Sequence, residues 1–386
     1  MKSLRKISTG ISNSFTIWSK ELKRACGDIG VFLFFVVVPV VYPILYGIIY
    51  NTEGIHEVPL IVVDESHSSL ARTFVRKIDA TADVQVYAYA TSMEEARAAI
   101  DNKEAYGILR IPADFSWKIN RGEQATVALY EDMSGLLFYK AVLLATTEAS
   151  LDGLVACDAS PVHYEAVAQY NPKSGFASFL LPAILILVIQ QTLLLGISML
   201  ATTTREKNQG RLIPPEICYS GTFRIVFGKA LAYLTVYIPM TIWALIIVPY
   251  IFQLPQSAHY ATILLFALPY LLACIAFAML ISTFIRGRET PMMILVFTSL
   301  IFLFISGISW PQSAIPAFWK YLGYALPSTF GIQGFVKINS MEATLNEVTF
   351  EYRMLWLQAG IYWLATCLIY GWNLGRNKLS NESTIT

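Results

Sequence analysis

Charged residues are scarce in this sequence and are missing from long stretches of it. Asp, Glu, Lys and Arg make up 14% of the 386 residues, whereas a soluble domain carries roughly 25%. Long runs without any of these residue types lie at 29–52, 174–204, 230–285, 291–319 and 354–375. An ordinary water-soluble protein is excluded, because a chain of this length could not bury all of these runs in one core.

Motifs for nucleotide binding and for common catalytic chemistry are also missing. The chain has no G-x-x-x-x-G-K-[ST], G-x-G-x-x-G, G-x-S-x-G or H-E-x-x-H sequence. Its cysteines do not follow a metal-binding spacing. The nearby His56, Glu57, Asp64 and His67 are expected to be ordinary surface residues. We therefore predict that this chain is not an enzyme, and that it has no catalytic residue, no metal site and no bound cofactor.

The uncharged runs predict six membrane-spanning helices. A transmembrane helix needs about 20 mostly apolar residues, and a charge at its centre costs about 2.5–3.5 kcal/mol. The longest run is divided by the polar, proline-containing segment 253–262. The predicted spans are roughly 30–50, 178–200, 228–251, 261–284, 291–309 and 355–374. The uncharged runs hold no carboxylate for proton or sodium coupling, so any transport is expected to draw its energy from outside the bilayer.

Basic residues indicate how the spans are oriented. They gather before the first span, between the second and third, between the fourth and fifth, and after the last. Because Lys and Arg collect on the cytoplasmic side, both termini are predicted to lie in the cytoplasm. The expected fold is a polytopic α-helical membrane protein with an extracytoplasmic domain, 51–175, inserted between the first helix, 29–50, and a five-helix membrane domain, 176–386.

The inserted domain is predicted to be an α/β domain, because short strands and helices alternate along it. Apolar, β-branched or aromatic runs predict strands at 58–64, 84–89, 105–111 and 125–131. Helices are expected at 68–80, 92–103 and 135–156. Ser92 and Glu95 form a capping box at the start of the second helix. Cys157 is the only cysteine of this segment, so an internal disulfide is excluded.

Two further segments are predicted to lie at the membrane surface. Residues 1–28 form an amphipathic helix, or else a simple positively charged anchor. Its apolar stripe is Ile7, Ile11, Phe15, Trp18 and Leu22, with Lys20, Lys23 and Arg24 on the other side. Residues 305–340 are rich in proline and aromatics and predict two short helices in an outer re-entrant hairpin, which lies flat or dips into the bilayer.

The loop 201–222, called the charged loop here, interrupts two uncharged spans. Pro214 and Pro215 prevent a continuous helix. The loop is therefore predicted to be a stiff, charged connection on the cytoplasmic side, the alternative being an ordinary solvated loop. Gln190 and Gln191 lie near the middle of the second span. They line a candidate substrate path or form an interhelical hydrogen bond, which is worth about 0.6 kcal/mol on average.

The charged loop resembles that of the type 2 ABC (ATP-binding cassette) exporter permeases, in the subgroup with a large extracytoplasmic domain. That family has the pattern E-R-E-K-x-x-G-T-L-E followed by G-K and a span. The matching residues here are Arg205, Glu206, Lys207, Gly210, Leu212, Gly228 and Lys229. Further likeness is seen in IVVDESHSSLAR, in AYGILRIPADF and in SGISWPQSAIP. The resemblance thus covers nearly the whole chain.

The resemblance implies a function and a set of partners. It implies a permease subunit that works as a dimer, with an identical or paralogous second subunit, in a bacterial inner membrane. A separate cytoplasmic ATPase would hold ATP-Mg and dock on the coupling residues Arg205, Glu206, Lys207, Gly210 and Arg211. The cargo would be amphipathic, such as a drug, lipid or glycan, and exported outward. A periplasmic adaptor and membrane lipid are further expected partners; nucleic acid is not.

Two other functions are compatible with parts of the sequence. A six-span membrane sensor would use the extracytoplasmic domain to bind a ligand, but the tail after the last span is only about a dozen residues. A membrane enzyme acting on lipids would need a catalytic constellation, and the motifs give none. The permease is therefore the preferred interpretation.

Overall fold

The chain divides into two compact units. The computed structural model describes residues 2–50, 56–131, 136–151, 176–214, 221–254, 256–307, 310 and 312–382. Met1–Asn51 and Gly175–Thr386 form the first unit, called the helical unit, and Thr52–Ser174 form the second, called the α/β unit. Cys157, on which the exclusion of an internal disulfide rests, lies outside the described residues.

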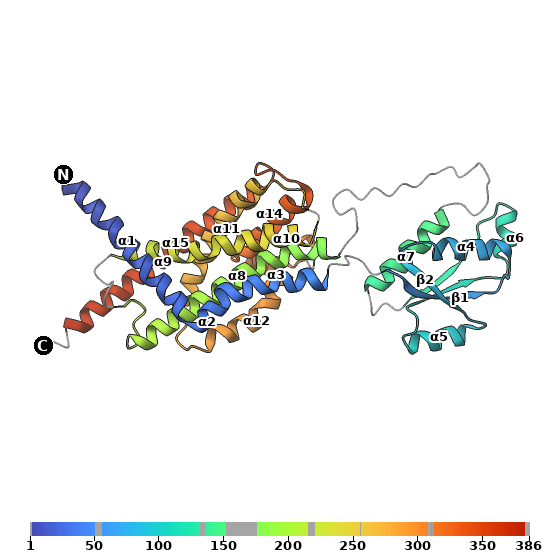
Figure 1. The fold of residues 1–386 in the computed structure, drawn as a ribbon, viewed down its shortest axis with the longest axis horizontal. Coiled ribbons are helices and arrows are strands. Elements are labelled where there is room, and N and C mark those ends of the chain that lie inside the picture. Colours follow the sequence, from blue (N-terminus) through green and yellow to red (C-terminus); the bar gives the residue numbers. More distant parts are fainter. Residues whose placement is uncertain are drawn as a thin grey trace. The chain divides into compact units, whose positions relative to one another are not determined.

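Long apolar helices make up most of the helical unit (Figure 1). Within the part of the chain that the structure describes, five candidate membrane spans lie at Ile29–Tyr50, Ser178–Lys207, Thr222–Ile251, Tyr260–Ser282 and Thr349–Gly375. They support a polytopic helical membrane protein. The remaining predicted span falls on α12 (Thr290–Ile305), which is 16 residues long and shorter than the other five. The total of six membrane spans therefore remains a prediction.

Several consecutive helical segments form single spans. The N-terminal helix is α1 (Lys2–Gly27). The first span is built from α2 (Ile29–Phe32), η1 (Leu33–Val37) and α3 (Val38–Ile49). The second is α8 (Phe176–Lys207). The third is built from α9 (Thr222–Ile242), η3 (Trp243–Ile247) and α10 (Val248–Ile251). The others are α11 (Tyr260–Ser282) and α15 (Thr349–Glu382).

A π-helical turn interrupts the first and the third span. Each turn comes shortly before a proline, Pro39 in one span and Pro249 in the other. A proline lacks an N–H and clashes with the preceding turn, and the wider π turn accommodates this without ending the helix. The indole N–H of Trp243 in η3 donates to the carbonyl oxygen of Val40 at 3.2 Å. The two interrupted spans are thus joined close to their wide turns.

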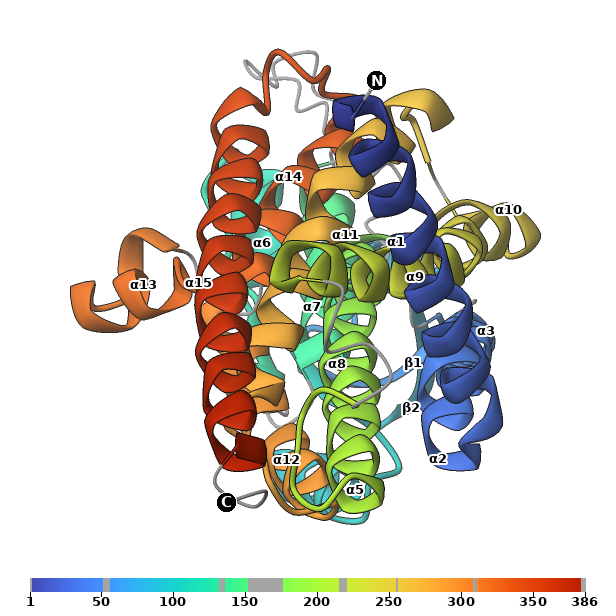
Figure 2. The same cartoon turned by 90° about the vertical axis from the view of Figure 1, so that its left-hand side faces the viewer.

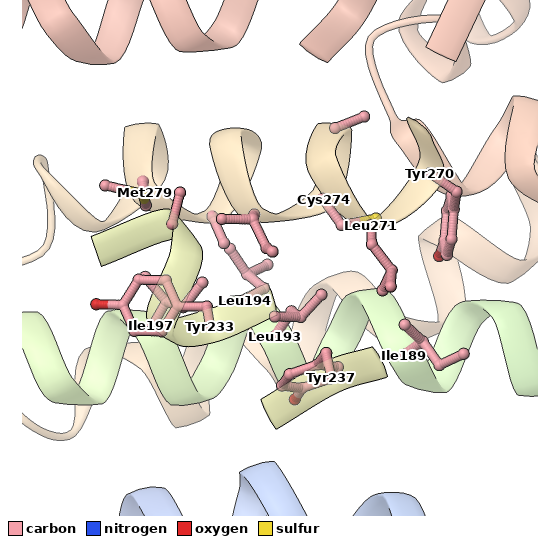
Figure 3. Packing of buried hydrophobic residues seen from close by; sticks show 14 of the residues in the cluster. Ile189, Leu193, Leu194, Ile197, Tyr233, Tyr237, Tyr270, Leu271, Cys274 and Met279 are labelled. Carbon is pink, nitrogen blue, oxygen red and sulfur yellow. The ribbon is translucent and has the colours of Figure 1, made fainter. Parts of the chain in front are cut away.

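The core of the helical unit forms around α8. This helix is apolar on all sides, and such a helix must be buried in protein or lipid. Figure 3 shows Leu193 and Ile197 of α8 in one cluster with Tyr233 and Tyr237 of α9 and Leu271 of α11. Because neighbouring helices cover α8 on several sides, its side chains are held in fixed surroundings.

The segment 305–340 contains two helices of different character. α13 (Ala317–Gly323) exposes Phe318 and Trp319. α14 (Pro327–Met341) is largely buried and packs against α8 and α11. Gly331 and Gly334 allow this close approach, because a Cβ atom would lie 2.5 Å from the Tyr270 ring at the first position and 2.3 Å from the Phe266 ring at the second. Protein therefore covers the backbone of α14.

In its described residues, the α/β unit has one four-stranded sheet. Its strands are β1 (Val58–Asp64), β2 (Val84–Tyr89), β3 (Gly107–Ile111) and β4 (Ala128–Glu131). The order is β2-β1-β3-β4. β1 is parallel to both neighbours, and β4 is antiparallel to β3. The helices are α4 (Ser69–Asp79), α5 (Met93–Asp101), α6 (Phe115–Asn120) and α7 (Leu136–Leu151). The short helix α6 was not predicted from the sequence.

Helices cover both faces of this sheet, as Figure 1 shows within the unit. Leu60 and Val62 of β1 belong to the cluster formed with α4 and α7, whereas Ile61 and Val63 pack with α5. This explains why β1 is apolar at consecutive positions rather than alternating. The predicted cap is present, since the Ser92 hydroxyl oxygen accepts from the N–H of Glu95 at 3.2 Å.

The close contact between α14 and α11 gives a test of the packing. Gly334→Ala should lower the thermal unfolding temperature of the purified protein, because its Cβ would meet the Phe266 ring, and overpacking costs about 1–3 kcal/mol. Gly360→Ala is the matched control, since nothing lies within 4 Å of its Cβ position on α15. Equal unfolding temperatures for the two variants would contradict the packing described.

Candidate functional site

The charged loop begins with a tight turn at the end of α8. The N–H of Gly210 donates to the carbonyl of Arg205 at 2.8 Å, and that of Arg211 donates to Asn208 at 3.0 Å. Gln209 and Gly210 have positive φ angles of 53° and 82°. Glycine is suited to this left-handed backbone, which commonly ends helices. The turn is therefore defined by main-chain hydrogen bonds.

Arg205 faces inward rather than toward a partner. Its Nη2 donates to the carbonyl of Thr283 at 2.5 Å, and its Nη1 donates to that of Ile285. These carbonyls follow the last residue of α11, where a helix leaves unpaired acceptors and the negative end of its dipole. Arg205 thus joins the end of α8 to the end of α11.

The rest of the described charged loop separates into an exposed and a buried part. Glu206, Lys207 and Gly210 are exposed, and Arg211 is half-buried. Leu212 and Ile213 turn back into the helical unit and belong to its core. Residues 215–220 lie outside the described residues. Of the predicted coupling residues, Glu206, Lys207 and Gly210 are therefore the ones that present an open surface.

A buried ion pair joins α1 to α9. The Lys229 ammonium lies 2.9 Å from Glu21 Oε1, and both side chains are almost fully buried, at 2% and 1% exposure. The Tyr233 hydroxyl donates to the same Glu21 oxygen at 2.6 Å. Arg24 approaches the other oxygen at 3.7 Å. Paired and hydrogen-bonded in this way, the charges can be buried.

The two helices meet closely beside this pair. A Cβ at Gly228 would lie 2.9 Å from the carbonyl oxygen of Ser14 and from the side chain of Ile17. The face that α1 turns toward the protein is formed by Ser14, Ile17, Glu21 and Ala25, whereas Phe15 of the predicted apolar stripe is 55% exposed. α1 therefore docks through a polar pair and leaves part of its stripe open.

The junction of α1 and α2 is fastened to α8. Asp28 caps α2, because its Oδ1 accepts from the N–H of Gly30 at 3.0 Å. Its Oδ2 accepts from the hydroxyl of Thr203 on α8 at 3.0 Å. A cap of this kind is worth about 1 kcal/mol. Asp28 thus connects the same end of α8 that carries the charged loop to the start of the first span.

Gln190 and Gln191 have different surroundings in the buried core. Gln190 Oε1 accepts from the N–H of Ser328 at 2.6 Å, so it satisfies a free donor in the first turn of α14. Among the described residues, neither amide atom of Gln191 has a hydrogen-bond partner, although this side chain is only 6% exposed. Gln190 therefore makes an interhelical bond through its oxygen while its Nε2 has no partner, and Gln191 has no partner at either amide atom.

No metal centre accompanies these features in the described part of the chain. Among those residues, no group of three or more His, Cys, Asp or Glu side chains could hold a metal ion. His56 lies 3.3 Å from Asp83, and Asp64 accepts from the backbone N–H of Ser66 and of His67. The candidate site joins helices through polar contacts and exposes a charged turn.

Comparison with known proteins identifies the family. The profile described as "ABC-2 family transporter protein" matches residues 30–368, which is most of the chain. The chain belongs to the ABC-2 transporter family. It is also similar to proteins described as "Probable multidrug ABC transporter permease YbhR" from Escherichia coli strains K12 and O157:H7. Each is 23% identical over 252 residues, covering 61% of this chain and 65% of the relative.

The sequence of this ABC-2 family member contains one signal for the buried pair. Lys229 belongs to a Gly-Lys step, but its partner Glu21 lies 208 positions away and is surrounded by Lys20, Lys23 and Arg24. Glu21 follows Ile17 by four residues, which places both on one face of a helix. A carboxylate on the apolar face of a basic helix is the sequence pattern that could have indicated this buried ion pair.

The buried pair predicts a non-additive effect on the stability of the permease. Glu21→Leu or Lys229→Met alone should each cost about 3–5 kcal/mol, because the remaining charge stays buried without its partner. The double variant Glu21→Leu/Lys229→Met should recover most of this loss, since both charges are gone. Thermal unfolding in detergent checks the cycle. Additive losses in the double variant would show that the two side chains do not interact.

The same pair predicts a dependence on pH. Burial raises the pKa of the Glu21 carboxyl, but Lys229 and the hydrogen bonds from Tyr233 and Lys229 outweigh it, so the pKa lies below 4.5. A lowered folded-state pKa gives stability that is present above the unfolded value of about 4.3 and is lost as pH falls through the folded value. Below about pH 4.3, the unfolding temperature of wild type should therefore fall relative to that of the double variant, which lacks Glu21. An unchanged difference would contradict this.

Proposed function

We propose that this chain is the membrane-spanning permease subunit of an ATP-driven exporter. It works as a dimer, with ATP-Mg held on a separate ATPase subunit, and moves an amphipathic compound outward across a bacterial inner membrane. Both termini and the charged loop lie in the cytoplasm, and the α/β unit lies outside. The observation that carries the proposal is the family match over residues 30–368.

The geometry of the charged loop supports a docking role. Glu206 and Lys207 are exposed next to a turn that main-chain bonds define. Arg205 connects this turn to the end of α11, and Asp28 connects the end of α8 to the first span. A force applied by an ATPase on the exposed residues would therefore act on several spans together. Arg205 contributes to coupling by holding the helices rather than by touching the partner.

The relatives and the core support an amphipathic cargo. The similar Escherichia coli proteins are described as probable multidrug permeases. Within the helical unit, the unpaired amide of Gln191 is a polar group in apolar surroundings, and such groups in membrane helices commonly mark a path. We assign Gln191 to the substrate path and Gln190 to the support of α14.

Reconstitution with an ATPase tests the proposal. The purified permease in lipid nanodiscs should bind one of the ABC-type ATPase subunits of its source organism and change that subunit's rate of ATP hydrolysis. Reversing the exposed charges in Glu206→Lys/Lys207→Glu should weaken this binding by at least about tenfold, which corresponds to 1.4 kcal/mol. Affinity and hydrolysis rate are both measured.

A matched control reverses one charge of each sign elsewhere. Lys320→Glu/Glu342→Lys changes a residue of α13 and the residue after α14, and it should leave ATPase affinity unchanged. The proposal fails if none of the ATPase subunits binds, or if both double variants bind as wild type does.

A further inference from the structure

A cavity of about 640 Å³ lies where the α1–α2 junction meets the end of α8. Its volume falls in the range of about 300–1,000 Å³ that is typical of small-molecule sites. Three parts of the chain line it: residues 23–24 with 27–30, the last turns of α8 with Asn208, and Arg288 before α12. The cavity is separate from the proposed substrate path, because neither Gln190 nor Gln191 lines it.

The lining of this cavity is mainly positive. Lys23, Arg24, Lys207 and Arg288 face a single lining carboxylate, that of Asp28, among the described residues. Both oxygens of Asp28 are occupied, one by the N–H of Gly30 and the other by the hydroxyl of Thr203. Arg288 approaches Asp28 only at 3.7 Å and is 52% exposed. The cavity therefore has an excess of positive charge and suits an anion.

Apolar surface continues from the same cavity along the first span. Ile29 and Leu200 contribute to its lining. Ile29 is 88% exposed, and Phe32 and Leu33 on the following turn are each 43% exposed. Ile29–Tyr50 is a candidate membrane span, so these side chains lie where acyl chains can cover them. An anion with an attached hydrocarbon chain matches both parts of the surface.

We propose that this cavity binds the phosphate of an anionic glycerophospholipid, with the acyl chains along the exposed side of α2 and η1. Basic pockets between membrane helices near the cytoplasmic surface are suited to such headgroups. A soluble acidic segment of a protein partner would match the cations but not the adjoining apolar surface. The assignment to the inner leaflet rests on the orientation in the proposed function, whereas binding itself does not.

The bound lipid would link elements that the protein also joins directly. Lys23 belongs to α1, Lys207 to α8, and Arg288 to the segment before α12. A phosphate contacted by these side chains would screen their mutual repulsion and hold the three elements together. The proposal therefore predicts that anionic lipid raises the thermal stability of the permease, and that zwitterionic lipid does so less.

The test measures lipid binding to the purified full-length permease without any ATPase. The probes are dioctanoyl-phosphatidylglycerol, dioctanoyl-phosphatidylcholine and glycerol 3-phosphate. Lys23→Gln/Arg288→Gln should weaken phosphatidylglycerol binding by at least about tenfold, because each cation near an anionic lipid contributes roughly fivefold. Both residues are exposed, so folding should be retained. Lys207 is left unchanged because it belongs to the charged loop.

The control is Arg224→Gln/Arg286→Gln, which removes two cations that do not line the cavity. It should bind phosphatidylglycerol as wild type does. Equal binding of phosphatidylglycerol and phosphatidylcholine, or equal loss in both double variants, overturns the proposal. Binding of glycerol 3-phosphate as tight as that of phosphatidylglycerol would assign the cavity to a soluble phosphate and overturn the lipid assignment.

One outcome would identify a protein occupant instead. If Lys23→Gln/Arg288→Gln leaves lipid binding intact but weakens ATPase affinity, the cavity receives acidic side chains of that partner, and the lipid proposal is wrong. Absence of an ATPase partner would by itself contradict only the proposed function, because the lipid measurement uses the permease alone.

Discussion

The buried ion pair between Glu21 and Lys229 is the constraint that fixes how α1 packs against α9. Separating the two charges would leave each one desolvated and unpaired, which is costly in a medium of low dielectric constant. α1 is therefore held to α9 by an interaction that cannot slide to a neighbouring position, unlike purely apolar packing. The close approach at Gly228 requires the same register. The N-terminal helix and the third span consequently behave as one body.

Two further polar connections lie close to the end of α8, and both involve helix ends or junctions. Arg205 satisfies carbonyls beyond α11, and Asp28 both caps α2 and accepts from Thr203. Backbone groups at helix ends need such partners when water is scarce. The same bonds that complete the hydrogen bonding of these ends also connect the spans mechanically. In the proposed exporter, structural need and force transmission are met by the same side chains.

Elements with strong local patterns were predictable from the sequence, and partners distant in the chain were not. The strands 58–64 and 84–89 and the cap at Ser92 follow from period, residue type and spacing. The inward direction of Arg205 could not be predicted, because a charged loop gives no sign that carbonyls from residues 283 and 285 lie beside it. Gln190 is similar, since its acceptor role depends on Ser328. Helix α6 was missed because six residues carry too little periodicity.

The wide turns η1 and η3 have a consequence for how the first and third spans can deform. Each contains one residue more than an α-helical turn, and the two interrupted spans are linked by the bond from Trp243 to Val40. When the π turn moves along the helix by one residue, a backbone N–H exchanges one carbonyl acceptor for the next. Few N–H groups are left unpaired during this movement, even in hydrocarbon. Every step of that kind rotates the segment it crosses by roughly 100° about its axis. The segment that is crossed can thereby turn relative to the rest of its span while the span remains helical.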